Sequence, residues 1–408
     1  MRLLGPALLL VACLLRANPT PELSHCPPMP PGTPPPKVPV GITAAQSAEA
    51  RSEARLAANP AAEARWRKLL GQEASLARRA AQHLVAFMPE ADLAGLDPDY
   101  VAENLRLALA ARAEFAWAAD VPEPIFLNDV APYAVLDEDR EPIRAWMLER
   151  LRPVVAGAKD RRAAILAVNR ALPSLAKVVY STKRRAPNQS SADSIRQGVA
   201  SCTGLSILLV DAFRAVGIPA RIAGCATWVT VRGNHNWVEV WDNGWHITEY
   251  NLDAKGLGHA WFRDRAAFAD PERPETRIVA TSWAPVDGGQ PFPLVWRLRS
   301  GDVSGVDRTA DYHAWAGGRR RALSEGESLL GVRVFRGETR EPTEVTVVQD
   351  GREIARVRTA GPAQDMMDVP WTRLETARGK VTLRAGELSR EVELKGGEET
   401  VVDLRLAP

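Results

Sequence analysis

Cysteine and histidine are scarce in this chain of 408 residues, which contains four cysteines and six histidines. The histidines are scattered without metal-ligand spacing, and no Cys-x-x-Cys pattern occurs. The sequence therefore predicts neither a zinc site nor a disulfide framework, and we expect no metal and no cofactor.

An excess of charge of one sign is also missing. The 52 Lys and Arg residues nearly balance 50 Asp and Glu residues, which leaves a formal net charge of +2. No dense basic run is interleaved with aromatic residues, so nucleic acid is not an expected partner. With 46% hydrophobic residues, the chain has enough apolar sequence to build two or three domains.

The first residues predict export. Leu3 to Val11 form an apolar segment that is too short to span a bilayer comfortably. We interpret residues 1–13 as an export signal, and Leu10-Val11-Ala12-Cys13 resembles a bacterial lipobox, in which the cysteine is lipidated. An ordinary cleaved signal and an uncleaved anchor are the alternatives. We expect a periplasmic or cell-surface protein, anchored to the membrane through Cys13 if the lipobox is used.

Two scaffold segments follow. Prolines crowd residues 14–43, a composition that favours extended chain and predicts a linker. Residues 44–176 are rich in Ala, Leu, Arg and Glu with apolar positions at helical spacing, and we expect a helical region there. Helices are predicted from Asp99, as N-cap, to Phe115, over residues 141–151 and over residues 160–171. No functional motif occurs in this region.

Cys202 is the first residue with a chemical signature. It stands where a glycine-containing loop, residues 198–204, gives way to apolar positions at helical spacing, and Gly217 with Pro219 predicts the end of that helix. The free N–H groups and the dipole of a helix start favour a thiolate, which is the nucleophilic form of cysteine. Taken alone, a cysteine at a helix start is most often a buried apolar residue, so the position of Cys202 is not decisive by itself. For Cys225, which has no such signature, we predict the role of a small buried apolar residue.

A predicted β-hairpin follows, with His235 to Trp241 as one strand and Trp245 to Tyr250 as the other. A two-residue turn at Asn243-Gly244 would place His235 and Glu249 on opposite faces. A three-residue loop with Gly244 in the left-handed position would pair residue 241 with residue 245. It would bring Glu249 diagonal to His235 and place Asn251 opposite it. We favour the three-residue loop because it gives the imidazole a polar partner.

This order of residues resembles the transglutaminase-like superfamily of papain-type thiol enzymes. A cysteine at a helix start is followed by His-x-Trp on a strand and by an acid on the next strand. The resemblance is close over roughly residues 180–255, and the wider pattern looks like a bacterial subgroup of exported proteins. It implies that Cys202 is the nucleophile, His235 the general base and Glu249 the residue that orients the histidine. The family usually has aspartate at the third position, and Asn251 is a rival because papain-like sites use asparagine there.

We expect an α+β fold with a papain/transglutaminase-like core at residues 177–300. Gln189 or Gln197 could add a side-chain N–H to the oxyanion hole. A linker is predicted at residues 301–325. Short alternating runs at residues 326–408 then predict a small antiparallel, Ig-like β-sandwich that is structural or docks a protein or carbohydrate.

The predicted function is acyl transfer on amide bonds of peptides or proteins through a Cys-His-acid triad. We favour a hydrolase, a peptidase or amidase, over a crosslinking enzyme. The alternatives are a protein-glutamine transglutaminase and a catalytically inactive binding or scaffold protein of the same fold.

Overall fold

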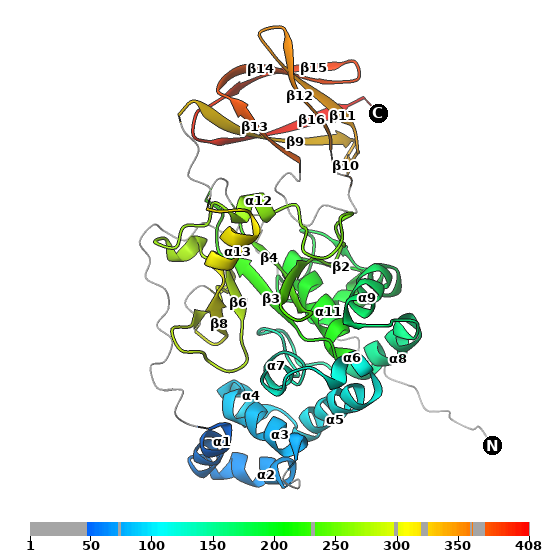
Figure 1. Ribbon diagram of the computed structural model, residues 1–408, viewed down its shortest axis with the longest axis vertical. Coiled ribbons are helices and arrows are strands. Elements are labelled where there is room, and N and C mark those ends of the chain that lie inside the picture. Colours follow the sequence, from blue (N-terminus) through cyan, green and yellow to red (C-terminus); the bar gives the residue numbers. More distant parts are fainter. Residues whose placement is uncertain are drawn as a thin grey trace, which may run out of the picture.

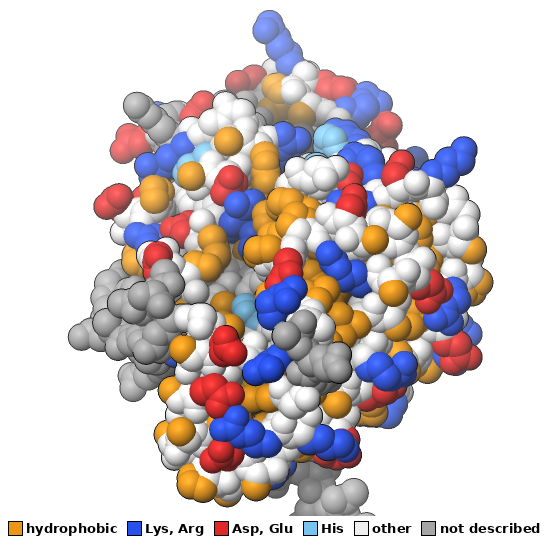
Figure 2. Space-filling model, turned by 60° about the horizontal axis from the view of Figure 1, so that its bottom comes forward, with side chains coloured by type: hydrophobic (Ala, Val, Ile, Leu, Met, Phe, Trp, Pro, Cys, Tyr) orange, Lys and Arg blue, Asp and Glu red, His pale blue; other side chains and the backbone are white. Residues whose placement is uncertain are grey.

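The computed structural model describes residues 47–407, apart from gaps at residues 72–74, 230–232, 298–300, 320–324, 360 and 362–371. The expected export signal, Cys13 and the linker predicted at residues 14–43 thus all lie outside the described residues. None of the described helices is long and apolar enough to cross a membrane. On the face drawn in Figure 2, basic and acidic side chains are mixed over the surface, in keeping with the nearly balanced composition.

The described part of the chain between residues 47 and 176 is helical, as predicted. Its helices are α1 (Ala48–Ala57), α2 (Pro60–Leu70), α3 (Leu76–Phe87), α4 (Glu90–Gly95), α5 (Pro98–Glu114), α6 (Ala116–Ala119), α7 (Glu123–Asp129), α8 (Arg144–Val155) and α9 (Arg161–Ala176). Side-chain caps fix several starts: Asn59 accepts from the N–H of Ala62 before α2, and Asp160 accepts from that of Ala163 before α9. The cap of α5 is Asp97 rather than the predicted Asp99, because Pro98 takes the first helical position.

A six-stranded antiparallel sheet forms the middle of the molecule, in the order β5-β4-β3-β6-β8-β7. Its strands are β3 (Ala220–Cys225), β4 (His235–Trp241), β5 (Trp245–Thr248), β6 (Val279–Thr281), β7 (Gln290–Pro291) and β8 (Ser304–Asp307). Helix α11 (Cys202–Ala215) is apolar nearly all round and packs against β3 and β4 in the largest hydrophobic core (Figure 1). The short elements β1 (Val179–Tyr180), α10 (Ser191–Gln197) and β2 (Val199–Ala200) lead into it.

The hairpin has the register that we favoured. Trp241 pairs with Trp245 across a three-residue loop, and the pairing continues to Val238 and Thr248. Two residues of the loop have positive φ, Asn243 with 56° and Gly244 with 153°, whereas only the glycine was predicted to have one. Asparagine tolerates the left-handed region because its short polar side chain can bond locally. Strand β5 also ends at Thr248, two residues earlier than predicted, so Glu249 lies just beyond the paired strand.

The linker predicted at residues 301–325 is wrong at residues 304–315, which form a strand of the sheet and a helix that packs on it. Strand β8 pairs with both β6 and β7, and helix α13 (Thr309–Trp315) buries Tyr312 in a core on the sheet. Residues 304–315 therefore belong to the core, which also includes α12 (Arg263–Ala266) and a 3-10 turn at Pro274–Thr276. The linker signal came from glycines, which here serve turns and close packing: a Cβ at Gly305 would stand 2.5 Å from Val279.

The C-terminal part is a two-sheet β-sandwich, as predicted, and we call it the C-terminal β-module. One sheet joins β9 (Glu327–Arg336), β10 (Thr339–Arg340), β13 (Thr372–Ala377) and β16 (Glu399–Leu406), and the other joins β11 (Glu344–Gln349), β12 (Arg352–Arg358), β14 (Gly379–Ala385) and β15 (Leu388–Leu394). Alternate residues such as Val332, Val334 and Leu383 fill its core. It is not purely antiparallel, because β16 pairs with β9 in parallel. In Figure 1 the module lies next to α12.

Candidate active site

Cys202 is the first residue of α11. Ser201 caps this helix by accepting a hydrogen bond from the N–H of Gly204 at 3.0 Å. The thiol therefore lies at the positive end of the helix dipole, as the sequence predicts. Cys202 is 9% exposed, so it sits at the edge of the buried core rather than on an open surface.

Asn236, the second residue of β4, links this strand to the start of α11. Its side-chain N–H donates to the Oγ1 of Thr203 at 2.8 Å. Its backbone carbonyl accepts from the hydroxyl of Ser206 at 3.1 Å. The neighbouring strand makes room for this amide at Gly224, where a Cβ would stand 2.0 Å from the Oδ1 of Asn236. These contacts fix the distance between the helix that carries Cys202 and the strand that begins with His235.

His235 and Glu249 form a buried pair. The Nε2 of His235 lies 2.7 Å from the Oε1 of Glu249, and their side chains are 0% and 3% exposed. With Nε2 taken, Nδ1 is the ring nitrogen left for Cys202. Nδ1 is buried and meets no partner with full hydrogen-bond geometry among the described residues, while the interaction between His235 and Cys202 shifts the pKa of both groups.

The electrostatics favour a thiolate and an imidazolium. Burial alone would raise the pKa of the Cys202 thiol, but its interaction with His235, together with the backbone of Asn236 and the charge of Arg184, leaves that pKa below its ordinary value. Burial alone would lower the pKa of His235, but its interactions with Cys202 and Glu249 raise that pKa to about 9. Each charge therefore stabilises the other, which is how a cysteine becomes nucleophilic near neutral pH.

Aromatic rings enclose the imidazole. The rings of Trp261, Phe262 and Trp237 lie 5.2, 5.3 and 5.6 Å from that of His235. Trp261 also donates its indole N–H to the Oε1 of Glu249 at 3.3 Å. The cluster keeps water away from the His235–Glu249 pair, so their interaction is stronger than in solvent.

Asn169 is a positioning residue that sequence reasoning missed. It lies on α9, is fully buried, and donates to the carbonyls of Glu249 at 2.8 Å and Tyr250 at 3.2 Å. Its own carbonyl accepts from Thr248. Glu249 lies beyond the end of β5, so this amide replaces the missing strand partner. The only signal in the sequence was a polar residue on the otherwise apolar face of the predicted helix.

Other predicted candidates take different places. The side-chain amide of Gln189 donates to the carbonyl of Val199 at 3.0 Å, and Gln197 accepts from the N–H of Arg185 at 3.2 Å. The side-chain N–H of Gln189 is thus bound to Val199, and both glutamines contact the segment that leads to Cys202. Asn251 follows the carboxylate on the same loop, but the contact to Nε2 of His235 is made by Glu249. Cys225 is a free, buried thiol whose pKa is raised by burial, as expected of an apolar role.

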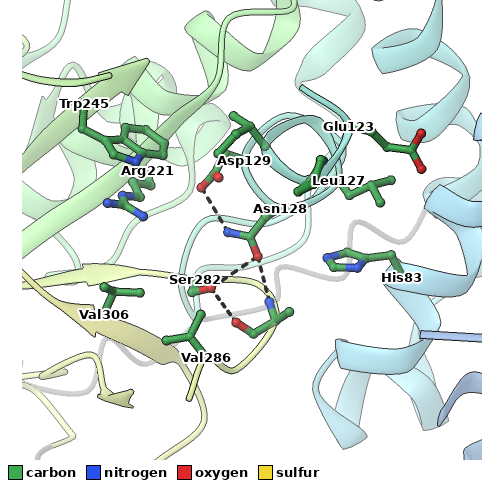
Figure 3. Close-up of a pocket in the computed structure, with 13 residues that line it drawn as sticks. His83, Glu123, Leu127, Asn128, Asp129, Arg221, Trp245, Ser282, Val286 and Val306 are labelled. Carbon is green, nitrogen blue, oxygen red and sulfur yellow. Dashed lines mark hydrogen bonds between the residues drawn. The ribbon is translucent and has the colours of Figure 1, made fainter. Parts of the chain in front are cut away.

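A cavity of about 480 Å³ lies elsewhere, between the helical region and the sheet (Figure 3). Arg221 lines it, but this guanidinium is bound to Glu239 at 2.8 and 2.9 Å and lies 3.8 Å from the centre of the Trp245 ring. Arg221 is at the start of β3, whereas Cys225, which pairs with His235, is at its end. We therefore do not include this cavity in the active site. Within the described ranges, no group of three or more His, Cys, Asp or Glu residues could hold a metal ion.

Residues 149–250, which contain all three predicted site residues, match the model of the transglutaminase-like superfamily. This segment is a transglutaminase-like domain. It begins in α8, so the domain reaches further into the helical region than the predicted boundary at residue 177.

Similarity to solved structures is low. A candidate cysteine protease from Cytophaga hutchinsonii is 19% identical over 28% of this chain and 40% of that chain, with a TM-score of 0.24. Red sea bream transglutaminase is 11% identical over 63% and 59%, with a TM-score of 0.27. GBS52, the minor pilin of Streptococcus agalactiae, is 8% identical over 46% and 82%, with a TM-score of 0.15. The chain thus spans less than two thirds of the first two proteins. No curated protein matches the sequence.

Proposed function

We propose that this protein is an exported cysteine-dependent acyl-transfer enzyme that acts on amide bonds of peptides or proteins. The observation that supports it is the buried contact of 2.7 Å between His235 and Glu249 beside a thiol of lowered pKa. A scaffold protein has no use for a buried imidazole held in its charged form. The transglutaminase-like domain gives the same residues a family in which cysteine chemistry is common.

The proposed reaction has two halves. The Cys202 thiolate attacks the amide carbonyl and forms a thioester, while the C–N bond breaks and the Nδ1 proton of His235 moves to the departing amine. Water, or a second amine, then gives a proton to His235 and attacks the thioester, which releases the acyl group and restores the thiolate. The backbone N–H of Cys202, at the helix start, is available to stabilise the oxyanion in both halves.

Hydrolysis is the favoured outcome, with glutamine transamidation as the alternative. The same three residues serve both, and the choice depends on whether the thioester meets water or an amine. Water is abundant in the periplasm and at the cell surface, where we expect the protein to be. We therefore propose a peptidase or amidase.

Alkylation of Cys202 tests the proposal without a substrate. Iodoacetamide should modify Cys202 rapidly at pH 7, because its pKa is lowered, and should leave Cys225 unmodified. Turnover of a substrate has a separate pH limit. The turnover rate should fall at alkaline pH as His235 loses its proton near pH 9, because His235 then has no proton to give to the departing amine. His235→Gln keeps a polar partner for Glu249 and should slow alkylation at pH 7 about a hundredfold.

Peptide mass spectrometry assigns each modified cysteine. Equal reactivity of Cys202 and Cys225 in the native protein would contradict a thiol-enzyme site. So would a rate at Cys202 that does not change in His235→Gln.

Membrane anchoring through Cys13 is part of the same proposal and has its own test. Cys13→Ala should move the mature protein from the membrane fraction to the soluble fraction, because the lipid is its anchor. The melting temperature should stay the same, since a proline-rich linker transmits no packing. Cys26→Ala is the matched control. A membrane fraction unchanged in Cys13→Ala, with the signal still removed from the variant, would rule out lipidation at this residue.

A further inference from the structure

We propose that Glu399 and Arg265 are positioning residues for the catalytic pair, so that the C-terminal β-module is a working part of the active site. This inference rests on the proposed function. It departs from the sequence-based interpretation of the module as a structural or docking domain, which found no catalytic residues in it. The argument follows three contacts that lead from β16 to His235.

The first contact joins the module to the core. Glu399, the first residue of β16, accepts a hydrogen bond from the Nη2 of Arg265 on α12 at 2.8 Å, and both side chains are 0% exposed. These residues are 134 positions apart in the sequence. A buried ion pair requires both partners, since either charge left alone in the interior is strongly disfavoured. The pair therefore fixes β16 and α12 relative to each other.

The second contact places Arg265 against Trp261 of the active-site cluster and against Trp228, whose ring lies 6.5 Å from that of His235. Its guanidinium carbon lies 5.8 Å from the centre of the Trp228 ring and 5.9 Å from that of Trp261. These distances are within the range of a cation–π interaction. Arg265 is 1% exposed, so its charge faces the rings and Glu399 instead of water. The guanidinium of Arg265 therefore limits how far the rings of Trp228 and Trp261 can tilt.

The third contact carries this restriction to the catalytic pair. Trp261 donates its indole N–H to the Oε1 of Glu249, the same oxygen that meets the Nε2 of His235. The Trp261 ring lies 5.2 Å from the imidazole. A tilt of this indole would remove a hydrogen bond from the carboxylate and admit water to the His235–Glu249 pair. Glu399 thus acts on the imidazolium through Arg265 and Trp261 without touching substrate.

A double variant, Arg265→Met/Glu399→Met, tests this in the full chain. Apolar residues of similar volume can replace a buried ion pair with little change in stability, so the melting temperature should stay close to that of the native protein. Alkylation of Cys202 by iodoacetamide at pH 6 should be about tenfold slower, with its pH midpoint moved upward. The matched control is Arg333→Met/Asp403→Leu, which removes an ion pair between β9 and β16 inside the module. It should leave both quantities unchanged.

Two further variants locate the effect. Trp261→Phe keeps the ring but removes the N–H, and should move the pH midpoint upward; adding it to the double variant should add little, because both act at the same point. Glu399→Gln keeps an oxygen that can accept from Arg265, and should keep the native alkylation rate and pH midpoint, although the lost charge should lower the melting temperature. If the double variant does not fold, Glu399→Asp, which keeps the charge but shortens the side chain, carries the same expectation for the rate and the midpoint.

The possible failures are distinct. If Cys202 of the native protein reacts no faster than Cys225, the proposed function itself is wrong. If Cys202 reacts in a His235-dependent way but the double variant, or Glu399→Asp in its place, has the native rate and midpoint, only the role of Arg265 and Glu399 is overturned. Fully additive effects of Trp261→Phe and the double variant would likewise exclude a path through Trp261.

Discussion

Replacing Cys202 by alanine is expected to abolish turnover of amide substrates, with a loss of about 10⁵-fold or more, because no other group can form the thioester. The fold should persist. Cys202 sits at the edge of the core with 9% exposure, and the cap of α11 is made by Ser201 rather than by the thiol. Cys202→Ser should lose nearly as much, since a hydroxyl is far harder to ionise than a thiol in this buried setting.

The measurement is mass spectrometry of the protein and of a glutamine-containing test peptide. An acyl group trapped on the native enzyme should map to Cys202 and be missing from Cys202→Ala. Conversion of the glutamine to glutamate indicates hydrolysis, and incorporation of an added primary amine indicates transamidation. Cys225→Ala is the matched control and should retain activity. Turnover that survives in Cys202→Ala would exclude the thioester route.

The parts of the site that lie close together in sequence were predicted well. The helix start at Cys202 followed from a loop, an apolar stripe and a glycine-proline end, all of which lie between residues 198 and 219. The hairpin register followed from a loop of three residues and the requirement that His235 have a polar partner. Both depend on short-range rules of helix capping and strand alternation. These rules determine the local conformation wherever the segment is placed in the fold.

The supporting contacts could not be predicted, because they join distant segments. Asn169 is 80 positions from Glu249, and Glu399 is 134 positions from Arg265. In the sequence, Asn169 is one polar residue on a helix and Glu399 is one charge on a strand, and each pattern is common on a solvated surface. Only the packing of α9 and of the C-terminal β-module onto the sheet buries these side chains and gives them partners. The boundary error at β8 and α13 has the same cause.

Glu249→Gln should reduce turnover on the order of a hundredfold or more while leaving the site geometry nearly intact. The amide oxygen of glutamine can still accept from the Nε2 of His235, so the ring keeps its orientation. The negative charge is lost, however, and that charge is one of the causes that raise the pKa of His235 to about 9. The pKa of His235 should therefore fall. Since a protonated His235 also holds the pKa of Cys202 down, the pKa of Cys202 should rise.

Alkylation of Cys202 as a function of pH measures both changes. In Glu249→Gln the pH at which the thiolate forms should move upward, and the pH above which turnover is lost should move downward, so the active range narrows from both sides. Asn251→Ala is the matched control, because Asn251 follows Glu249 by two residues but brings no charge to the imidazole. It should cost less and leave both limits in place. A pKa of Cys202 that is unmoved by Glu249→Gln but raised by Asn251→Ala would instead assign the site to a Cys-His-Asn arrangement, with Glu249 serving only to hold the loop.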